Sequence, residues 1–224
     1  MEVKAIGRIR KLLEGIDAGS VGDDEQLTLT GQLEQFVALG ASPYGEIVRM
    51  GRAFVINDTT AVAAVVAIPT TAIGFCIYNG EPDGGRSYVI DWVAAQNVVS
   101  TAVVCQAQII ANLGQVREAI PTNSAMVPKK LNGQGPGTGD TKVLSVLTTV
   151  LPGTTGIAAN WFPLGASGNK PGAAATPGYG MYAPVDGRII VPPGRYYAVH
   201  VLANVVGETF VHWIAWHERQ LTLG

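Results

Sequence analysis

The chain has 224 residues, of which 47% are hydrophobic and only 14% are charged, and its formal net charge at pH 7 is −2. An average soluble domain carries roughly 25% charged residues, so we expect part of this surface to be covered by other subunits. The acidic balance provides no basic field for nucleic acid, and no uninterrupted run of about 18 apolar residues predicts a membrane span.

Residues 1–48 are predicted to form an N-terminal arm and linker, with one strand or hairpin in residues 27–39. Charges run through the first 16 residues, which argues against a secretory signal. The apolar residues of this segment share one helical stripe, which consists of Ile6, Ile9, Leu13 and Ile16. A short amphipathic helix lying on its own domain and an arm that binds neighbouring subunits fit this stripe equally. Isoleucine at stripe positions favours three-stranded packing.

From Arg49 onwards β patterns dominate, and residues 49–224 are predicted to form the main domain. About eight strands separated by turn signals predict an all-β fold, a jelly-roll-like β-sandwich. Residues 81–85 form a turn by composition, and residues 152–184 are expected to be a long irregular segment. The clearest strand patterns lie in residues 52–57, 61–69, 72–80, 86–99, 100–114, 141–151, 187–191, 195–204 and 208–218.

The last two strands hold all three histidines and are expected to form a hairpin. Side chains alternate across a strand, so His212 and His217 are predicted to lie on opposite faces and cannot share one metal ion. His200 can pair with at most one of them. Zinc sites need three or four ligands, so we predict structural histidines and no metal site or cofactor.

Other catalytic patterns are weak, and the chain is not expected to be an enzyme. The glycine-rich segment at residues 135–142 lacks the lysine directly after its last glycine that a phosphate loop requires. Cys76 and Cys105 lie in apolar strand patterns, which predicts buried free thiols. No spacing selects a catalytic pair of carboxylates.

Four aromatic residues in the predicted irregular segment are possible binding contacts. Exposed aromatic rings stack on sugars or insert into a protein partner, whereas buried ones would close one end of the sandwich. These residues are Trp161, Phe162, Tyr179 and Tyr182.

Three stretches resemble a group of virion structural proteins of tailed bacteriophages. They are "KAIGRIRKLLEGIDAG", the segment from "VRMGRAFVIND" to "GGRSYVIDWV", and the closing "DGRIIVPPGRYYAVHV…WIAWHE". The group usually has "N-x-x-G-S-G" after its middle apolar strand, where this chain has Asn79, Gly80, Gly84 and Gly85 with "EPDG" replacing part of the pattern. Head-decoration (cement) proteins resemble this plan of an arm and a jelly-roll body.

The resemblance implies a non-enzymatic virion protein, assembled in the host cytoplasm. The expected role is capsid decoration by a homo-oligomer, with a trimer favoured, that binds the major capsid protein or other virion proteins. One alternative is a tail-fibre or receptor- and carbohydrate-binding jelly roll that uses the aromatic residues. A less favoured alternative is a cupin-type metalloenzyme with a metal at His200 and a second histidine.

Overall fold

The computed structural model describes residues 43–58, 60–70, 74–101, 103–115, 117, 126–135, 141–145, 161–170 and 178–221. The predicted arm, with Ile6, Ile9, Leu13 and Ile16, lies outside the described residues. No helix in the described ranges has the length and apolar character needed to cross a membrane.

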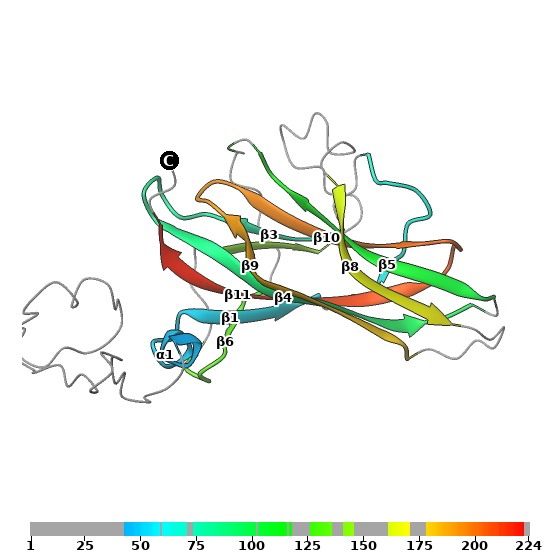
Figure 1. Ribbon diagram of the computed structural model, residues 1–224, viewed down its shortest axis with the longest axis horizontal. Coiled ribbons are helices and arrows are strands. Elements are labelled where there is room, and N and C mark those ends of the chain that lie inside the picture. Colours follow the sequence, from blue (N-terminus) through cyan, green and yellow to red (C-terminus); the bar gives the residue numbers. More distant parts are fainter. Residues whose placement is uncertain are drawn as a thin grey trace, which may run out of the picture.

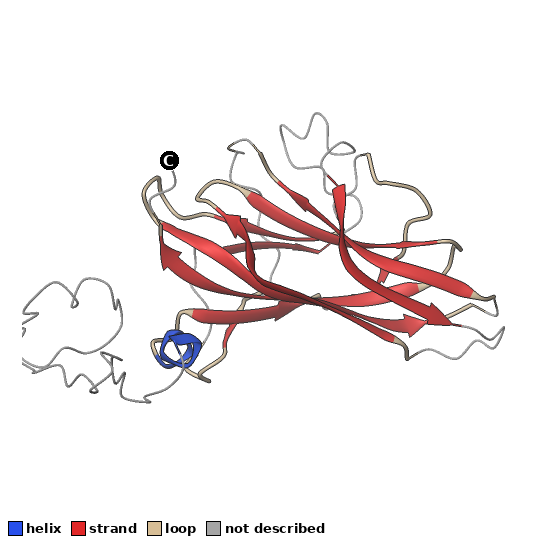
Figure 2. Cartoon of the chain, in the orientation of Figure 1, coloured by secondary structure: helices blue, strands red, loops and turns tan. Residues whose placement is uncertain are grey.

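The described chain forms two antiparallel sheets packed face to face, as Figures 1 and 2 show. The six-stranded sheet has the order β6 (Lys129–Lys130), β1 (Ala53–Asn57), β11 (Thr209–Gln220), β4 (Arg86–Val99) and β9 (Gly180–Val191), with β2 (Val62–Ala63) also paired to β11. The five-stranded sheet has the order β7 (Thr141–Ser145), β3 (Phe75–Asn79), β10 (Tyr196–Ala203), β5 (Cys105–Leu113) and β8 (Trp161–Lys170).

Strands far apart in the sequence pair with one another in a nested order. β1 pairs with β11, β3 with β10, β4 with β9 and β5 with β8. This order is that of a long hairpin rolled into two sheets, which is the jelly-roll arrangement. The predicted all-β sandwich is therefore confirmed.

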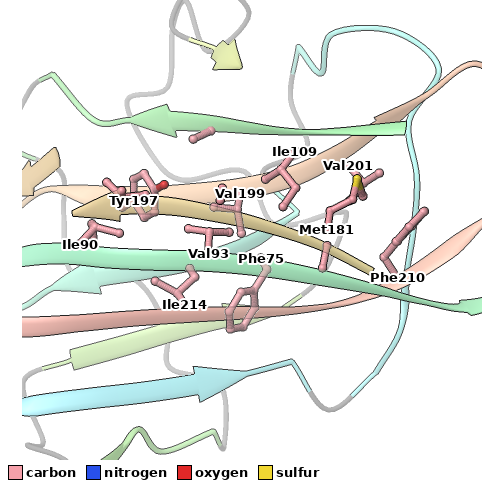
Figure 3. Close-up of a cluster of buried hydrophobic side chains, with 14 of the residues drawn as sticks. Phe75, Ile90, Val93, Ile109, Met181, Tyr197, Val199, Val201, Phe210 and Ile214 are labelled. Atoms are coloured by element: carbon pink, nitrogen blue, oxygen red, sulfur yellow. The ribbon is translucent and has the colours of Figure 1, made fainter. Parts of the chain in front are cut away.

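The core lies between the sheets and is built from alternate residues of the long strands. Figure 3 shows its centre, where Ile90, Val93 and Ile214 of one sheet face Val199 and Ile109 of the other. Each fully buried side chain of this size contributes roughly 1.5–3 kcal/mol relative to an exposed one. Cys76 and Cys105 are buried free thiols, as predicted.

Two expectations about the secondary structure and its pairing are wrong. The strands that carry the histidines do not form a hairpin, because β10 and β11 lie in opposite sheets. Residues 152–184 are not irregular throughout, because they include all of β8 and the start of β9. β8 contains Pro163 and is an edge strand, the position within a sheet where proline is tolerated.

A short helix, α1 (Pro43–Arg49), occupies a segment expected to be a break between domains. It begins at a proline, whose fixed φ suits the first helical position. The helix lies beside β1 in Figure 1, and its Tyr44 contacts the outer face of the six-stranded sheet.

Candidate functional site

The three histidines occupy two different environments. His212 lies on the inner face of β11 with Phe210 and Ile214, whereas His217 lies on its outer face. The predicted separation of His212 and His217 onto opposite faces of one strand is confirmed. His200, on β10, comes close to His212 from the other sheet, with ring centroids 6.3 Å apart.

Asp58 holds His212 in a buried pair. The Nδ1 of His212 donates to the Asp58 carboxylate over 2.8 Å, and the backbone amide of His212 donates to its other oxygen over 2.9 Å. Both side chains are fully buried. This geometry fixes the orientation of the His212 ring and assigns the proton on its Nδ1 to the hydrogen bond with Asp58.

His200 is held in the opposite tautomer. Its Nδ1 accepts a hydrogen bond of 2.9 Å from the backbone amide of Val201, so its Nε2 carries the proton. The ring lies over Gly74, where an added Cβ would be 2.8 Å from Cδ2 of His200. A protonated Nε2 has no lone pair for a metal ion, so the geometry does not support the cupin-type pair of His200 and His212.

No group of three or more histidine, cysteine, aspartate or glutamate side chains in the described ranges is arranged to hold a metal ion. Glu218, which follows His217 in the sequence, faces the interior and receives a hydrogen bond of 3.3 Å from Arg86. The adjacent histidine and carboxylate of the last strand therefore do not act on one another.

His217 instead belongs to a polar cluster on the outer face of the six-stranded sheet. Its Nδ1 donates to Asp91 over 2.7 Å, and the Tyr44 hydroxyl donates to the other Asp91 oxygen over 3.1 Å. The Tyr44 and His217 rings meet edge to face. Burial, and then the neighbouring Asp91 charge, raise the pKa of Tyr44 well above its ordinary value, so Tyr44 remains a donor.

A β-bulge in β4 turns two consecutive side chains to this outer face. Ile90 pairs with Trp216 and Trp92 with Ala215, which leaves Asp91 as an extra residue. Ile90 and Val93 are buried in the core, whereas Asp91 and Trp92 are both half-buried on the outside. The bulge therefore places a carboxylate and an indole side by side, which regular alternation forbids.

The neighbouring strand β9 is irregular at the same level. Between its pairings with Trp92 and Ile90 it inserts several extra residues, which include Asp186 and Gly187. Asp186 has a φ of 51°, and among the described residues it is the one non-glycine with a positive φ. Left-handed non-glycine residues are uncommon, although aspartate adopts this conformation more readily than most, and they concentrate at turns and functional sites.

These features line a groove of about 670 Å³ on the outer face of the six-stranded sheet, which we call the outer groove. Tyr182 of β9 lies beside Trp92, with ring centroids 5.8 Å apart and planes tilted by 37°. The polar residues of the outer groove are Tyr44, Asp91, Asp186, His217 and Arg219.

A second surface feature lies at one end of the sandwich, where β4 and β10 finish and β5 and β11 begin. Five valines there are between 38% and 71% exposed, and residues 97–107 and 204–207 contain no charged side chain. Gln106 and Asn204 of these segments line a hollow of about 790 Å³ together with Val66 and Ile68. We call this surface the valine end, and it consists of Val98, Val99, Val103, Val104 and Val206.

The four aromatic candidates have different environments and do not form one loop. Trp161 and Phe162 begin β8 and are half-buried, packed against the core clusters. Tyr179 packs edge to face on Phe210, and its hydroxyl lies 3.3 Å from the sulfur of Cys105. Tyr182 is 59% exposed and lies in the outer groove.

Most outer-groove residues were missed because they are brought together by tertiary structure. Asp91 and Trp92 looked like ordinary positions of an alternating strand, and Tyr44 was expected to lie in a linker. One signal was available in the sequence. Asp186 and Gly187 form an Asp-Gly pair, which often marks positive φ angles.

Comparisons with family models, with curated proteins and with solved structures give no match to this chain.

Proposed function

We propose that this chain is a non-enzymatic structural protein of a bacteriophage particle and that it decorates the capsid. The proposal is supported by the resemblance of its first residues, of its middle strands and of its closing "DGRIIVPPGRYYAVHV" to virion proteins. A jelly roll is a frequent body for capsid proteins, although the fold also serves lectins and enzymes.

The observation that carries the proposal is the valine end. An uncharged surface with Val206 71% exposed and Val99 54% exposed is costly unless a partner covers it. In the proposed assembly, the valine end binds neighbouring virion subunits, such as the major capsid protein. The stripe of Ile6, Ile9, Leu13 and Ile16 adds further contacts, and a homotrimer is the favoured oligomer.

The experiment is co-sedimentation of the purified full chain with phage heads that lack it. A double variant, Val99→Asp with Val206→Asp, should bind the heads about tenfold more weakly or worse, because two carboxylates would have to be desolvated in the interface. Val127→Asp is the matched control, since Val127 is 52% exposed and lies outside the valine end.

Equal binding by the double variant and the control would contradict the role of the valine end. Failure of the unaltered chain to bind any phage head would contradict the virion proposal itself. Sedimentation velocity on the same samples reports the subunit number, for which we expect three.

A further inference from the structure

The outer groove has the composition of a site for a small polar molecule and is separate from the valine end. Its volume of about 670 Å³ falls within the ~300–1,000 Å³ typical of ligand sites. We propose that the outer groove binds a neutral saccharide, with Trp92 and Tyr182 as the stacking platform and with Asp91, Asp186 and His217 as hydrogen-bonding partners.

The aromatic part of the site comes from two adjacent strands. Trp92 pairs with Pro184, and Tyr182 pairs with Ala94, so the two rings are diagonal neighbours on one face of the β4–β9 ladder. Their 37° tilt forms an angled platform rather than a closed stack. The C–H faces of a sugar ring pack against aromatic faces, whose π-electrons carry partial negative charge.

The polar part of the site is already oriented. Asp91 is fixed by Tyr44 and His217, so its position is set before any ligand arrives. The hydrogen bond from Nδ1 of His217 to Asp91 fixes the imidazole ring, and a ligand hydroxyl group can pair with Nε2 because a hydroxyl both donates and accepts. Oriented groups of this kind lose little conformational entropy on binding, which increases affinity.

The charges that line the outer groove select against ionic ligands. Two carboxylates, Asp91 and Asp186, stand against the guanidinium of Arg219, and the imidazole of His217 is bound to one of the carboxylates. Because charges of both signs line the outer groove, neither an anionic phosphate nor a cationic quaternary ammonium group would meet a uniformly attractive potential. Hydroxyl groups both donate and accept, and therefore match this mixture.

The backbone around the outer groove has two irregular conformations. The β4 bulge turns Asp91 and Trp92 outward together, and the left-handed Asp186 sits where β9 inserts its extra residues. The Arg188 side chain braces that insertion by donating to the carbonyl oxygens of Val185 and Pro184. Bulges and left-handed residues are over-represented next to functional sites, so two irregularities at the same level of adjacent strands support a ligand site here.

The test uses the full chain and a panel of neutral oligosaccharides: maltohexaose, cellohexaose, xylohexaose and mannohexaose, together with an array of neutral, sialylated and sulfated glycans. Binding is measured by titration calorimetry and by the change in tryptophan fluorescence that a ligand over Trp92 should cause. We expect at least one neutral glycan to bind, and Tyr182→Ala to weaken its binding about tenfold or more.

Two controls separate ring stacking from other effects. Tyr182→Phe keeps the ring and should bind the glycan within about threefold of the unaltered chain. Val206→Ala changes only the valine end and should leave glycan binding unchanged. Tyr182 is largely exposed, so its truncation should leave the fold intact. Absence of binding to every neutral glycan, equal binding by Tyr182→Ala, or binding of charged glycans alone would overturn the proposal. The inference does not rest on the virion role, since its readout needs no phage particle.

Discussion

At the scale of single residues, His200 shows how burial alone can make a fold sensitive to acid. Its side chain is fully buried, between the ring of Trp161 and that of His212. Desolvation by burial, and then the nearby His212, lower the pKa of His200 from 6.5 to about 3. The folded protein therefore keeps this ring neutral at pH values where the unfolded chain protonates it.

The first prediction concerns the pH dependence of stability. Between pH 6.5 and about 3 the unfolded chain binds the extra proton on His200, so the free energy of unfolding should fall as the pH drops through this window. In His200→Gln, which cannot titrate, the fall between pH 7 and pH 5 should be clearly smaller. Urea denaturation at pH 7, 6 and 5 measures the free energy of unfolding of both proteins. An equal decrease with falling pH in the two proteins would refute the prediction.

At the scale of elements, the irregular β4–β9 pair decides where the outer groove lies. Gly187 has a φ of 74°, and a Cβ there would lie 3.2 Å from Cγ1 of Val89. The left-handed conformation suits glycine and is costly for other residues. The insertion in β9 therefore depends on a backbone angle that Gly187 provides.

The second prediction follows from this angle. Gly187→Ala should lower the free energy of unfolding by about 1–2 kcal/mol, because alanine must adopt a left-handed conformation. Ser167→Ala on the exposed face of β8 is the control and should change stability by less than about 0.5 kcal/mol. Chemical denaturation of the two variants compares them directly, and a neutral Gly187→Ala would mean that the insertion relaxes freely.

The elements themselves differed in how far the sequence predicted them. β4 has the predicted bounds, because β-branched and aromatic residues are frequent along it and a turn segment precedes it. β8 was missed because Pro163, Gly165 and Gly168 are turn residues by composition, and only an edge position makes them acceptable in a strand. The outer groove could not be foreseen, because a bulge becomes visible only when the register of two strands is known.

At the scale of the whole molecule, one buried ion pair ties the two sheets together. Lys170 ends β8 in the five-stranded sheet, and Glu208 precedes β11 in the six-stranded sheet, with Nζ and Oε1 3.0 Å apart. The Glu208 carboxylate also accepts from the amide and hydroxyl of Thr101, and from Asn97. Burial acts to raise the pKa of Glu208, but the hydrogen bonds from Lys170 and Thr101 outweigh it and hold this pKa below its ordinary value.

The third prediction tests this tie between the sheets. Lys170→Met leaves a buried carboxylate without its cation and should lower the free energy of unfolding by about 3–5 kcal/mol at pH 7. Adding Glu208→Gln removes the uncompensated charge, so the double variant should recover part of the loss. Urea denaturation of both variants measures the difference, and a double variant no more stable than Lys170→Met would argue against charge burial as the cause.

The nested pairing of strands also has a consequence for biosynthesis. Ala53 opens β1 and pairs with His217, near the end of the described chain, so β1 has no strand on that side until β11 has been made. At ~5–20 residues per second, a ribosome takes roughly 8–30 s to cover that distance. Both sheets therefore close late, and the apolar strands made first are exposed to aggregation during this interval, a period in which a chaperone would increase the yield of folded protein.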